Sequence, residues 1–409
     1  MFTRRQFHQL GAAGVAGLML PRRRVHAAQP SVDAAGNHFS RAPGPASGVA
    51  LAGVPRGSDA AAVARAVRRA AESVTDFAWL SRGDTVLIKP VCNSGNAYPA
   101  TTDPVALHAM VRLLKEKGAG RVVVGDMSGV QFVRFQKDSL RGSSRALMVE
   151  CGVARAAEEA GAELVAFEEA GWDGFVPETP LDGPDWKRPI LMPQIAADAD
   201  HIVLMPRCAR HVLAGSTLGL KAAVGWWRTD SRYEYHHDAA SFSRKTAEAN
   251  TIPLLLDKQR LVLTSATEVL STFGPDQGYI AKPETGLVIA SRSVVSHDMV
   301  SLAWLLDSQQ LATPRADREG VLNDPNQSET IVNLMNRVVT VWLGGGIRGA
   351  ISAETLERYD LDSVWSDRVL QAAFRIKGGV PELDLAAIDR SVPDALRARL
   401  QGAIMPPLA

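Results

Sequence analysis

The chain has 409 residues, of which 46% are hydrophobic and 22% charged, and its formal net charge is +1. This balance excludes a disordered or collagen-like chain and is typical of a globular protein with one large or two ordinary domains. No basic stripe with interleaved aromatic residues follows residue 28, so a nucleic-acid partner is not expected.

The first 28 residues predict a twin-arginine export signal. TRRQF (3–7) precedes a short apolar stretch (10–20), and RRRVHAA with a small-x-small cleavage site follows. The apolar stretch is about half of what a bilayer crossing needs. We expect cleavage near Ala28, passage through the twin-arginine translocase, a periplasmic or otherwise exported location and no stable membrane anchor afterwards. An uncleaved tether is the alternative. Without the five arginines of this segment the net charge becomes −4.

Strand and helix patterns alternate along most of the remaining chain. Residues 29–48 are small, polar and proline-bearing, which indicates a linker. Apolar, β-branched runs then alternate with amphipathic helical patterns. The runs that indicate strands are TVLIKP (85–90), RVVVGDMSG (121–129), the end of ARAAEEAGAELVAFEE (154–169), DHIVLMPR (200–207), RLVLTSATEVL (260–270) and TGLVIASRSVV (285–295).

This alternation predicts an α/β protein with a mostly parallel, Rossmann-like sheet covered by helices on both faces. We expect a second, smaller α/β portion and a mainly helical C-terminal region at 328–409. The α/β core would span 49–327, with a subdivision near 215–260 left open.

Three local motifs have structural interpretations. TTDP (101–104) predicts a helix start capped by Asp103 or Thr102, with Pro104 in the first turn. His297-Asp298 open another predicted helix, where a capping role for Asp298 fits better than metal binding. GGGIRG (344–349) is interpreted as a turn or a lid hinge.

An internal echo suggests that two strands end at one edge of the sheet. GDTVLIKPVC (83–92) and ADHIVLMPRC (199–208) each place an aspartate eight residues before a cysteine. Ligands of open parallel sheets bind beyond the carboxyl ends of the strands. The echo would therefore bring together Lys89, Cys92, Asp126, Arg207, Cys208 and His211; a coincidence of two buried strands is the alternative.

The cysteines leave two further possibilities open. Cys92 and Cys208 could form a disulfide in an oxidising compartment or lie near a metal. The chain has three cysteines, too few for a ferredoxin-type cluster.

Four motifs resemble one known family. VLIKPVCNSG, YPATTDPVALHAMVRLLKEKGAGRVVVGDMSG, HIVLMPRCARHVLAGSTLGLKAAVG and SHDMVSLAWLL look like the domain-of-unknown-function family 362. The resemblance spans roughly residues 49–306. It implies a shared fold but supplies no reaction.

The chain also bears a distant resemblance to the nickel-pincer lactate racemase family. In that family a histidine after a strand, a lysine and a nickel-ligating histidine follow one another at intervals of 10 and 16 residues, as His211, Lys221 and His237 do here. The resemblance implies that Lys221 anchors the pincer nucleotide covalently, that His237 ligates nickel and that His211 shuttles a proton. The second catalytic histidine of the racemases is replaced by Asp126, and their nucleotide loop is not evident after Lys89.

The same stretch has other interpretations. GSTLGLK (215–221) could be a serine-capped helix with Lys221 paired to an aspartate. His236 and His237 are adjacent and point different ways on regular structure, so at most one is expected to ligate a metal. GWWRTDSRYEY (225–235) gathers aromatic and guanidinium groups that suit a sugar acid or another carboxylated ligand, although its tryptophans could be core residues.

We interpret the chain as a metal- or cofactor-dependent racemase or epimerase of a small hydroxy acid or sugar-derived substrate, with the enzyme assignment itself left open. A nickel-pincer nucleotide or another divalent metal is the expected cofactor. A non-catalytic periplasmic metal- or ligand-binding protein is the alternative, and a redox or iron–sulfur-associated protein the second. The candidate residues are catalytic His211, Asp126 and Lys89; cofactor-binding Lys221, Arg207, Trp226 and Arg228; and metal-ligating His237, His211 and His236.

Overall fold

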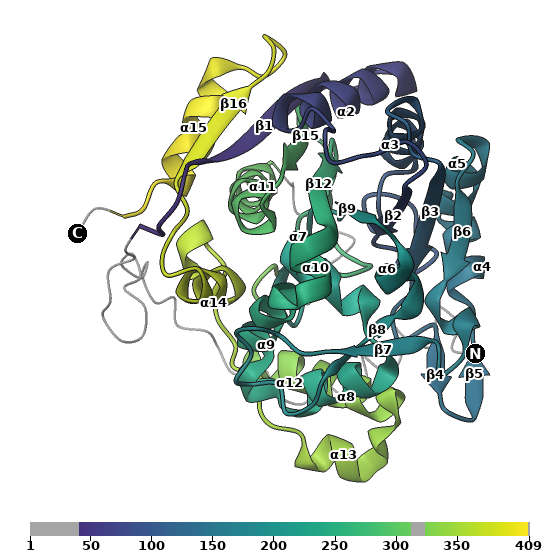
Figure 1. Cartoon of the computed structure of the whole chain (residues 1–409). Coiled ribbons are helices and arrows are strands. Elements are labelled where there is room, and N and C mark those ends of the chain that lie inside the picture. The colour runs from purple at the N-terminus through teal and green to yellow at the C-terminus, as the bar shows by residue number, and fades with distance from the viewer. Residues whose placement is uncertain (1–40, 312–323, 408–409) are drawn as a thin grey trace. The chain divides into compact units, whose positions relative to one another are not determined.

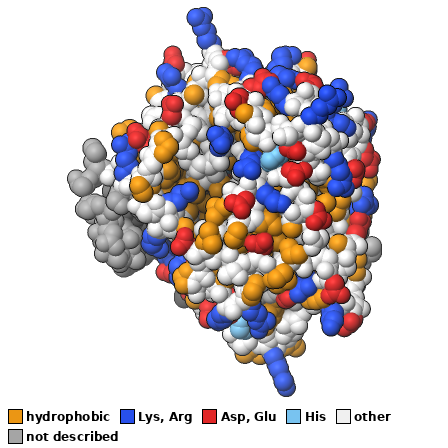
Figure 2. Space-filling model, viewed as in Figure 1, with side chains coloured by type: hydrophobic (Ala, Val, Ile, Leu, Met, Phe, Trp, Pro, Cys, Tyr) orange, Lys and Arg blue, Asp and Glu red, His pale blue; other side chains and the backbone are white. Residues whose placement is uncertain are grey.

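The computed structural model describes residues 41–311 and 324–407 (Figure 1). The predicted export signal and residues 29–40 of the predicted linker lie outside the described residues. The first strand, β1 (Ser47–Pro55), begins two residues before the predicted start of the α/β core. No helix within the described ranges has both the length and the apolar character needed to cross a membrane. On the face seen in Figure 2, Lys and Arg side chains are interspersed with Asp and Glu rather than gathered in one patch.

An eight-stranded sheet forms the centre of the fold, in the order β16-β1-β15-β12-β9-β2-β3-β6. Within this sheet β15 alone runs antiparallel to its neighbours. The predicted α/β class with a mostly parallel sheet is therefore confirmed. Besides β1, the strands are β2 (Thr85–Pro90), β3 (Arg121–Asp126), β6 (Glu163–Ala166), β9 (His201–Met205), β12 (Gln259–Ala266), β15 (Thr285–Ser291) and β16 (Leu383–Ala387).

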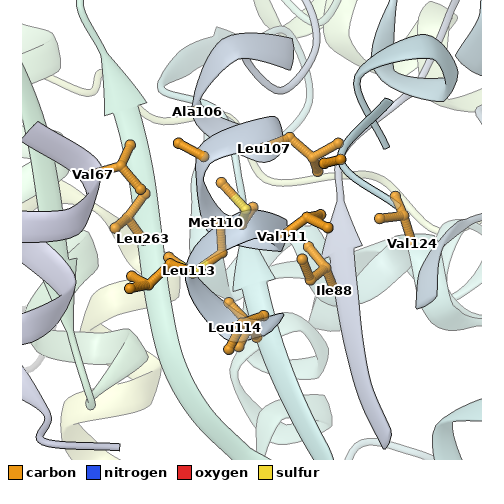
Figure 3. Packing of buried hydrophobic residues seen from close by; sticks show 14 of the residues in the cluster. Val67, Ile88, Ala106, Leu107, Met110, Val111, Leu113, Leu114, Val124 and Leu263 are labelled. Carbon is orange, nitrogen blue, oxygen red and sulfur yellow. The ribbon is translucent and has the colours of Figure 1, made fainter. Parts of the chain in front are cut away.

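One face of this sheet is covered by α2 (Ala60–Val74), α3 (Pro104–Glu116) and α5 (Val153–Glu159). Apolar residues of α3 recur every three or four positions, which places them on one side of the helix. In Figure 3 they point toward Ile88, Val124 and Leu263 of the sheet. Full burial of each large aliphatic side chain contributes about 1.5–3 kcal/mol. Asp103 caps α3 and Pro104 is its first residue, as predicted.

The other face is covered by α11 (Val294–Gln309), α14 (Arg368–Ile376) and α15 (Asp394–Ile404) near β1 and β15. Smaller elements cover it near β2, β3 and β9. These are α6 (Gln194–Asp198), α7 (Gly219–Ala222), η2 (Ala223–Trp226), α8 (Thr229–His237), η3 (Ala239–Ser241), α9 (Phe242–Glu248), η4 (Ala249–Thr251), α10 (Pro253–Lys258) and α12 (Glu329–Thr340).

Three smaller sheets and short helices complete the described residues. A four-stranded sheet consists of β11 (Gly215–Thr217), β10 (Ala209–His211), β13 (Val269–Leu270) and β14 (Ile280–Ala281). Two hairpins are β4 (Arg134–Gln136) with β5 (Ser139–Arg141), and β7 (Phe175–Glu178) with β8 (Ile190–Pro193). The short helices are η1 (Phe167–Ala170), α4 (Ser144–Glu150), η6 (Val341–Gly345), α13 (Gly346–Ser352) and η7 (Val364–Ser366). The C-terminal region is mainly helical, as predicted, but its strand β16 joins the central sheet beside β1.

The two echoing segments are neighbours in space. Strands β2 and β9 pair in parallel, with Lys89 opposite Leu204 and Pro90 opposite Met205. They therefore end at the same edge, together with β3. The disulfide alternative is wrong, because Cys92 and Cys208 are both buried free thiols. The Cys208 thiol donates to the carbonyl of Ser301 at 3.4 Å, and the Cys92 thiol lies beside Cys151.

Candidate functional site

A cavity of about 150 Å³ lies beyond the carboxyl ends of β2 and β3 and beside the residues that follow β9. This is the expected ligand position in an open parallel sheet. The described residues that line it include four basic side chains and a single carboxylate. The polar and titratable ones are Lys89, Asn93, Asp126, Gln131, Arg207, His211, Thr217, Lys221, Arg232 and His236.

Lys89 and Asp126 form a buried ion pair at the strand ends. The Lys89 amine lies 2.8 Å from Asp126 Oδ1, and Asp126 Oδ2 accepts the backbone N–H of Cys92 at 2.6 Å. Gly225 lies against this pair. A Cβ at Gly225 would come within 2.6 Å of Asp126 Oδ1 and would also overlap the Lys89 amine. The pair therefore depends on the absence of a side chain at this position.

Two guanidinium groups give the cavity a positive character. Arg232 donates to the backbone carbonyls of Met127, Ser128 and Trp227 at 2.7–2.9 Å. It is buried and has no carboxylate partner among the described residues. Burial lowers its pKa to about 10, so it stays charged at neutral pH. Arg207 donates to the carbonyl of Ala100, and its buried Nε has no hydrogen-bond partner among the described residues.

The nearest additional carboxyls only partly offset these charges. Asp276 lies near Arg207 and accepts from Asn93 and Ser94, and Glu168 lies near Arg232. Burial raises the pKa of both carboxyls, which opposes their ionisation. An anion that enters the cavity would therefore find an excess of positive charge.

Lys221 reaches the cavity from the short helix α7. The start of α7 is fixed by Asp298, whose carboxylate accepts the backbone N–H groups of Gly219 at 2.8 Å and Leu220 at 2.7 Å. The Lys221 amine has no hydrogen bond or ion pair with any described residue; it lies 5.7 Å from the ring centre of Tyr235 and 5.9 Å from that of Phe242.

The surroundings of Lys221 favour its neutral form. Burial, followed by the charges of Arg207, Arg232 and Lys89, lowers the pKa of Lys221 to about 7. The predicted alternative of a serine-capped helix with Lys221 paired to an aspartate does not describe this arrangement. No serine caps α7, and the aspartate that contacts it holds the backbone rather than the amine.

His211 is held in one tautomer. Its Nδ1 accepts the backbone N–H groups of Leu213 at 3.1 Å and Ala214 at 3.3 Å. The proton of the neutral ring therefore lies on Nε2. Burial, with Lys221 and Arg207 nearby, lowers the pKa of His211 well below its usual value. His211 is thus a neutral hydrogen-bond donor toward a ligand in the cavity.

His236 is held in the opposite tautomer. The amide of Asn336 donates to the carbonyl of His236 at 2.9 Å, so its oxygen accepts from His236 Nδ1 at 2.8 Å. The lone pair of the neutral ring therefore lies on Nε2, which has no partner within the described ranges. Burial lowers the pKa of His236 to about 3, with Lys221 and Arg232 contributing. The cavity thus contains one histidine donor and one histidine acceptor.

Helix α12 and the following short helix η6 line one side of the cavity, with Met335, Val339, Trp342 and Leu343. Gly344 of η6 has a φ of 98°, which favours glycine. The segment predicted as a turn or lid hinge (344–349) is therefore irregular only at its start, because helix α13 begins at Gly346.

Three candidate residues lie away from the cavity. His237 binds Asp238 at 2.8 Å and Ser352 at 3.0 Å. Trp226 is buried and stacks on Phe167 at 5.5 Å between ring centres. Arg228 forms an ion pair with Asp230 and lies over Trp172. By contrast, Lys89, Asp126, Arg207, His211, Lys221 and His236 all line the cavity.

The sequence interpretation missed Arg232, Thr217 and Asn336. Arg232 precedes His236 by four residues on α8, so the two side chains share one helix face. That spacing could have identified Arg232 as a neighbour of the predicted His236, and it separates His236 from His237. Thr217 ends β11 with a buried hydroxyl that lacks a partner in the described part of the chain. Asn336 comes from α12, 100 residues after His236, and no local pattern indicates their contact.

These features describe an α/β protein with a cationic, lysine-containing site at the carboxyl edge of its sheet. Residues 86–303, more than half of the chain, match the family model described as Domain of unknown function (DUF362). The chain belongs to this family, as its motifs predicted.

No curated protein matches the sequence. Two solved structures are similar to it at low identity. A protein from Thermotoga maritima aligns with a TM-score of 0.38 and 15% identity, covering 62% of this chain and 58% of that one. The lactate racemase apoprotein from Thermoanaerobacterium thermosaccharolyticum aligns with a TM-score of 0.31 and 14% identity, covering 51% and 48%. The chain thus spans about half of the length of each.

The residues present do not fit a nickel-pincer nucleotide held as the racemase resemblance implied. Lys221 has a free amine, but His237 faces Asp238 and Ser352 instead of the cavity. The described residues contain no group of three or more His, Cys, Asp or Glu side chains placed to hold a metal ion. The cavity of about 150 Å³ is also smaller than the roughly 300–1,000 Å³ of pockets that enclose larger ligands.

Proposed function

We propose that the cavity is the active site of an isomerase of the racemase or epimerase type, which acts on a small hydroxy acid or sugar-derived acid. The observation that carries this proposal is the presence of two nitrogen atoms without partners among the described residues, Lys221 Nζ and His236 Nε2, on side chains that line one small cationic cavity. A water molecule needs about 10–15 Å³, so the cavity suits a ligand of roughly ten non-hydrogen atoms.

The carboxylate of such a ligand would bind beside the cations of the cavity. Arg207, Lys221 and Arg232 all line it. A bound carboxylate would place its negative charge next to these side chains. His211 Nε2–H would donate to a hydroxyl or carbonyl oxygen of the ligand.

Inversion at carbon requires a group that removes a proton and another source that returns it. Because the pKa of Lys221 is about 7, its acid and base forms are both populated at neutral pH. His236 Nε2 is the second acceptor. Burial, with contributions from Lys221 and Arg232, lowers the pKa of His236 to about 3, and the negative charge of a ligand would oppose the contribution of these cations. The fixed charges of Lys89 and Arg232 would stabilise negative charge that develops on the substrate.

The test follows configuration and proton exchange together. Enantiopure 2-hydroxy acids of three to six carbons and aldonic acids are incubated with the protein in D2O, then analysed by chiral chromatography and proton NMR. We expect loss of optical purity together with deuterium at the inverted carbon. Lys221→Met should lower the rate at least about 100-fold, the size of a typical acid–base contribution.

Lys137 provides the matched control, because it is exposed and lies outside the cavity lining. Lys137→Met should retain the wild-type rate. Retention of configuration with every acid, or an unchanged rate in Lys221→Met, would contradict the proposal. Export through the twin-arginine pathway is part of this proposal and is supported by the sequence of residues 1–28 alone.

A further inference from the structure

Inversion of the substrate requires removal of a hydrogen from carbon, and a lysine in the cavity can make that hydrogen more acidic. A hydrogen next to a carboxylate alone is weakly acidic, because the carboxylate already carries negative charge. A hydrogen next to a protonated imine is far more acidic, since the electron pair left behind spreads onto nitrogen. Lysine amines form such imines with carbonyl substrates when they are held uncharged.

Lys89 and Lys245 are buried lysines of the described residues, and Lys221 differs from both. Lys89 is paired with Asp126, and Lys245 is paired with Glu234 and Asp238 at 3.2 Å each. Those carboxylates give each amine an ion-pair partner and a hydrogen-bond acceptor. The Lys221 amine has neither type of partner among the described residues.

The neighbours of Lys221 also favour a nucleophilic amine. Burial and the nearby charges of Arg207 and Arg232 disfavour a proton on Nζ. The faces of Tyr235 and Phe242 lie within 6 Å of Nζ and attract an ammonium, which offsets only part of this effect. A neighbouring cation is one of the conditions that activate imine-forming lysines. The side chain emerges from a helix start that Asp298 holds in place, and Lys221 lines the cavity.

We infer that Lys221 forms an imine with the substrate, an inference that rests on the proposed function. The substrate class is then a small acid that also carries an aldehyde or ketone. The epimerised carbon would be the one next to that carbonyl.

The reaction balances without an oxidant or reductant. The amine lone pair attacks the carbonyl carbon, a C–N bond forms, and one N–H proton passes to the carbonyl oxygen, to which His211 donates a hydrogen bond. The oxygen takes a second proton from solvent and leaves as water, and a protonated imine remains.

His236 Nε2 then removes the proton from the adjacent carbon, and the electron pair moves toward nitrogen to give an enamine. Protonation from solvent on the other face inverts the carbon, and His236 Nε2 returns the proton that it removed to solvent. Addition of water to the imine then restores the carbonyl and the free amine of Lys221.

Reductive trapping tests this inference. The protein is incubated at pH 7 with pyruvate or 2-oxobutyrate and sodium cyanoborohydride, and peptide mass spectrometry measures the reduced adduct at each lysine. We expect at least tenfold more adduct on Lys221 than on exposed Lys137. The adduct should saturate with oxo acid and fall when excess propionate occupies the cavity. Lys221→Arg, which keeps a cation, should abolish the adduct, with folding verified by thermal melting.

The outcomes separate the two proposals. Trapping at Lys221 without configuration exchange of any acid would support the imine and overturn the isomerase. Exchange of hydroxy acids without trapping would overturn the imine and leave Lys221 as an acid–base group. Labelling of Lys221 no greater than that of Lys137 would likewise overturn the imine.

Discussion

Replacing Lys221 with methionine should make the folded protein more stable at neutral pH. In the wild-type chain, burial and the charges of Arg207, Arg232 and Lys89 lower the pKa of Lys221 from 10.5 to about 7. One pKa unit corresponds to about 1.36 kcal/mol, so the shift of about 3.5 units bounds the penalty near 5 kcal/mol. The amine opens onto the cavity, where solvent screens it, and we expect a gain of about 1–3 kcal/mol in Lys221→Met.

The pH dependence of this gain has a defined sign. Below pH 7 the amine is charged in both the folded and unfolded chains, and the wild type bears the full penalty. Between pH 7 and 10.5 the unfolded chain binds a proton that the folded chain does not, so wild-type stability rises with pH. The difference between Lys221→Met and wild type should therefore shrink over this window.

Urea unfolding of wild type, Lys221→Met and Lys137→Met at pH 6, 7, 8.5 and 10 measures this difference. Lys137→Met controls for the loss of an exposed lysine and should match wild type at each pH. A Lys221→Met variant that is less stable than wild type at pH 7, or whose advantage stays constant up to pH 10, would refute the assignment of a destabilised amine.

Three further substitutions test the structure around the cavity. Gly225→Ala should cost about 1–3 kcal/mol in urea unfolding, because its methyl displaces the buried ion pair, whereas Gly402→Ala, with open space around its Cβ, should be neutral or stabilising. Asn336→Asp should raise the His236 pKa above about 3 in an NMR titration, since a carboxylate replaces the amide; an unchanged value would contradict the assigned contact. Asp298→Ala should lower stability by about 2–4 kcal/mol, and a neutral effect would show that α7 does not need this carboxylate.

Local patterns were sufficient for the elements that build the carboxyl edge. The prediction for residues 85–90 matches β2, and Asp103 with Pro104 marks the start of α3. The segments 83–92 and 199–208 have similar sequences that end in a cysteine, and they proved to contain the neighbouring strands β2 and β9. The similarity was informative because buried parallel strands have similar, mostly apolar composition and end at the same edge of the sheet.

The details of the site depend on contacts between distant segments. The racemase resemblance pointed to His237, which follows Lys221 by 16 residues. Successive residues of a helix point about 100° apart, however, and His236 rather than His237 lines the cavity. Its tautomer is set by Asn336 on α12. Asp298 was expected to cap its own helix, yet it holds α7, 79 residues earlier. No spacing within the chain predicts these pairs, because tertiary packing creates them.

The protonation state of Lys221 is the property on which the account depends most directly. Competitive acylation of Lys221 and Lys137, followed by mass spectrometry from pH 5 to 11, measures both amines in the same sample. The account predicts a Lys221 midpoint at about pH 7, which moves upward when a small hydroxy acid places its negative charge in the cavity. A midpoint near 10.5 that no acid shifts would contradict the cavity's role as a site for small carboxylates.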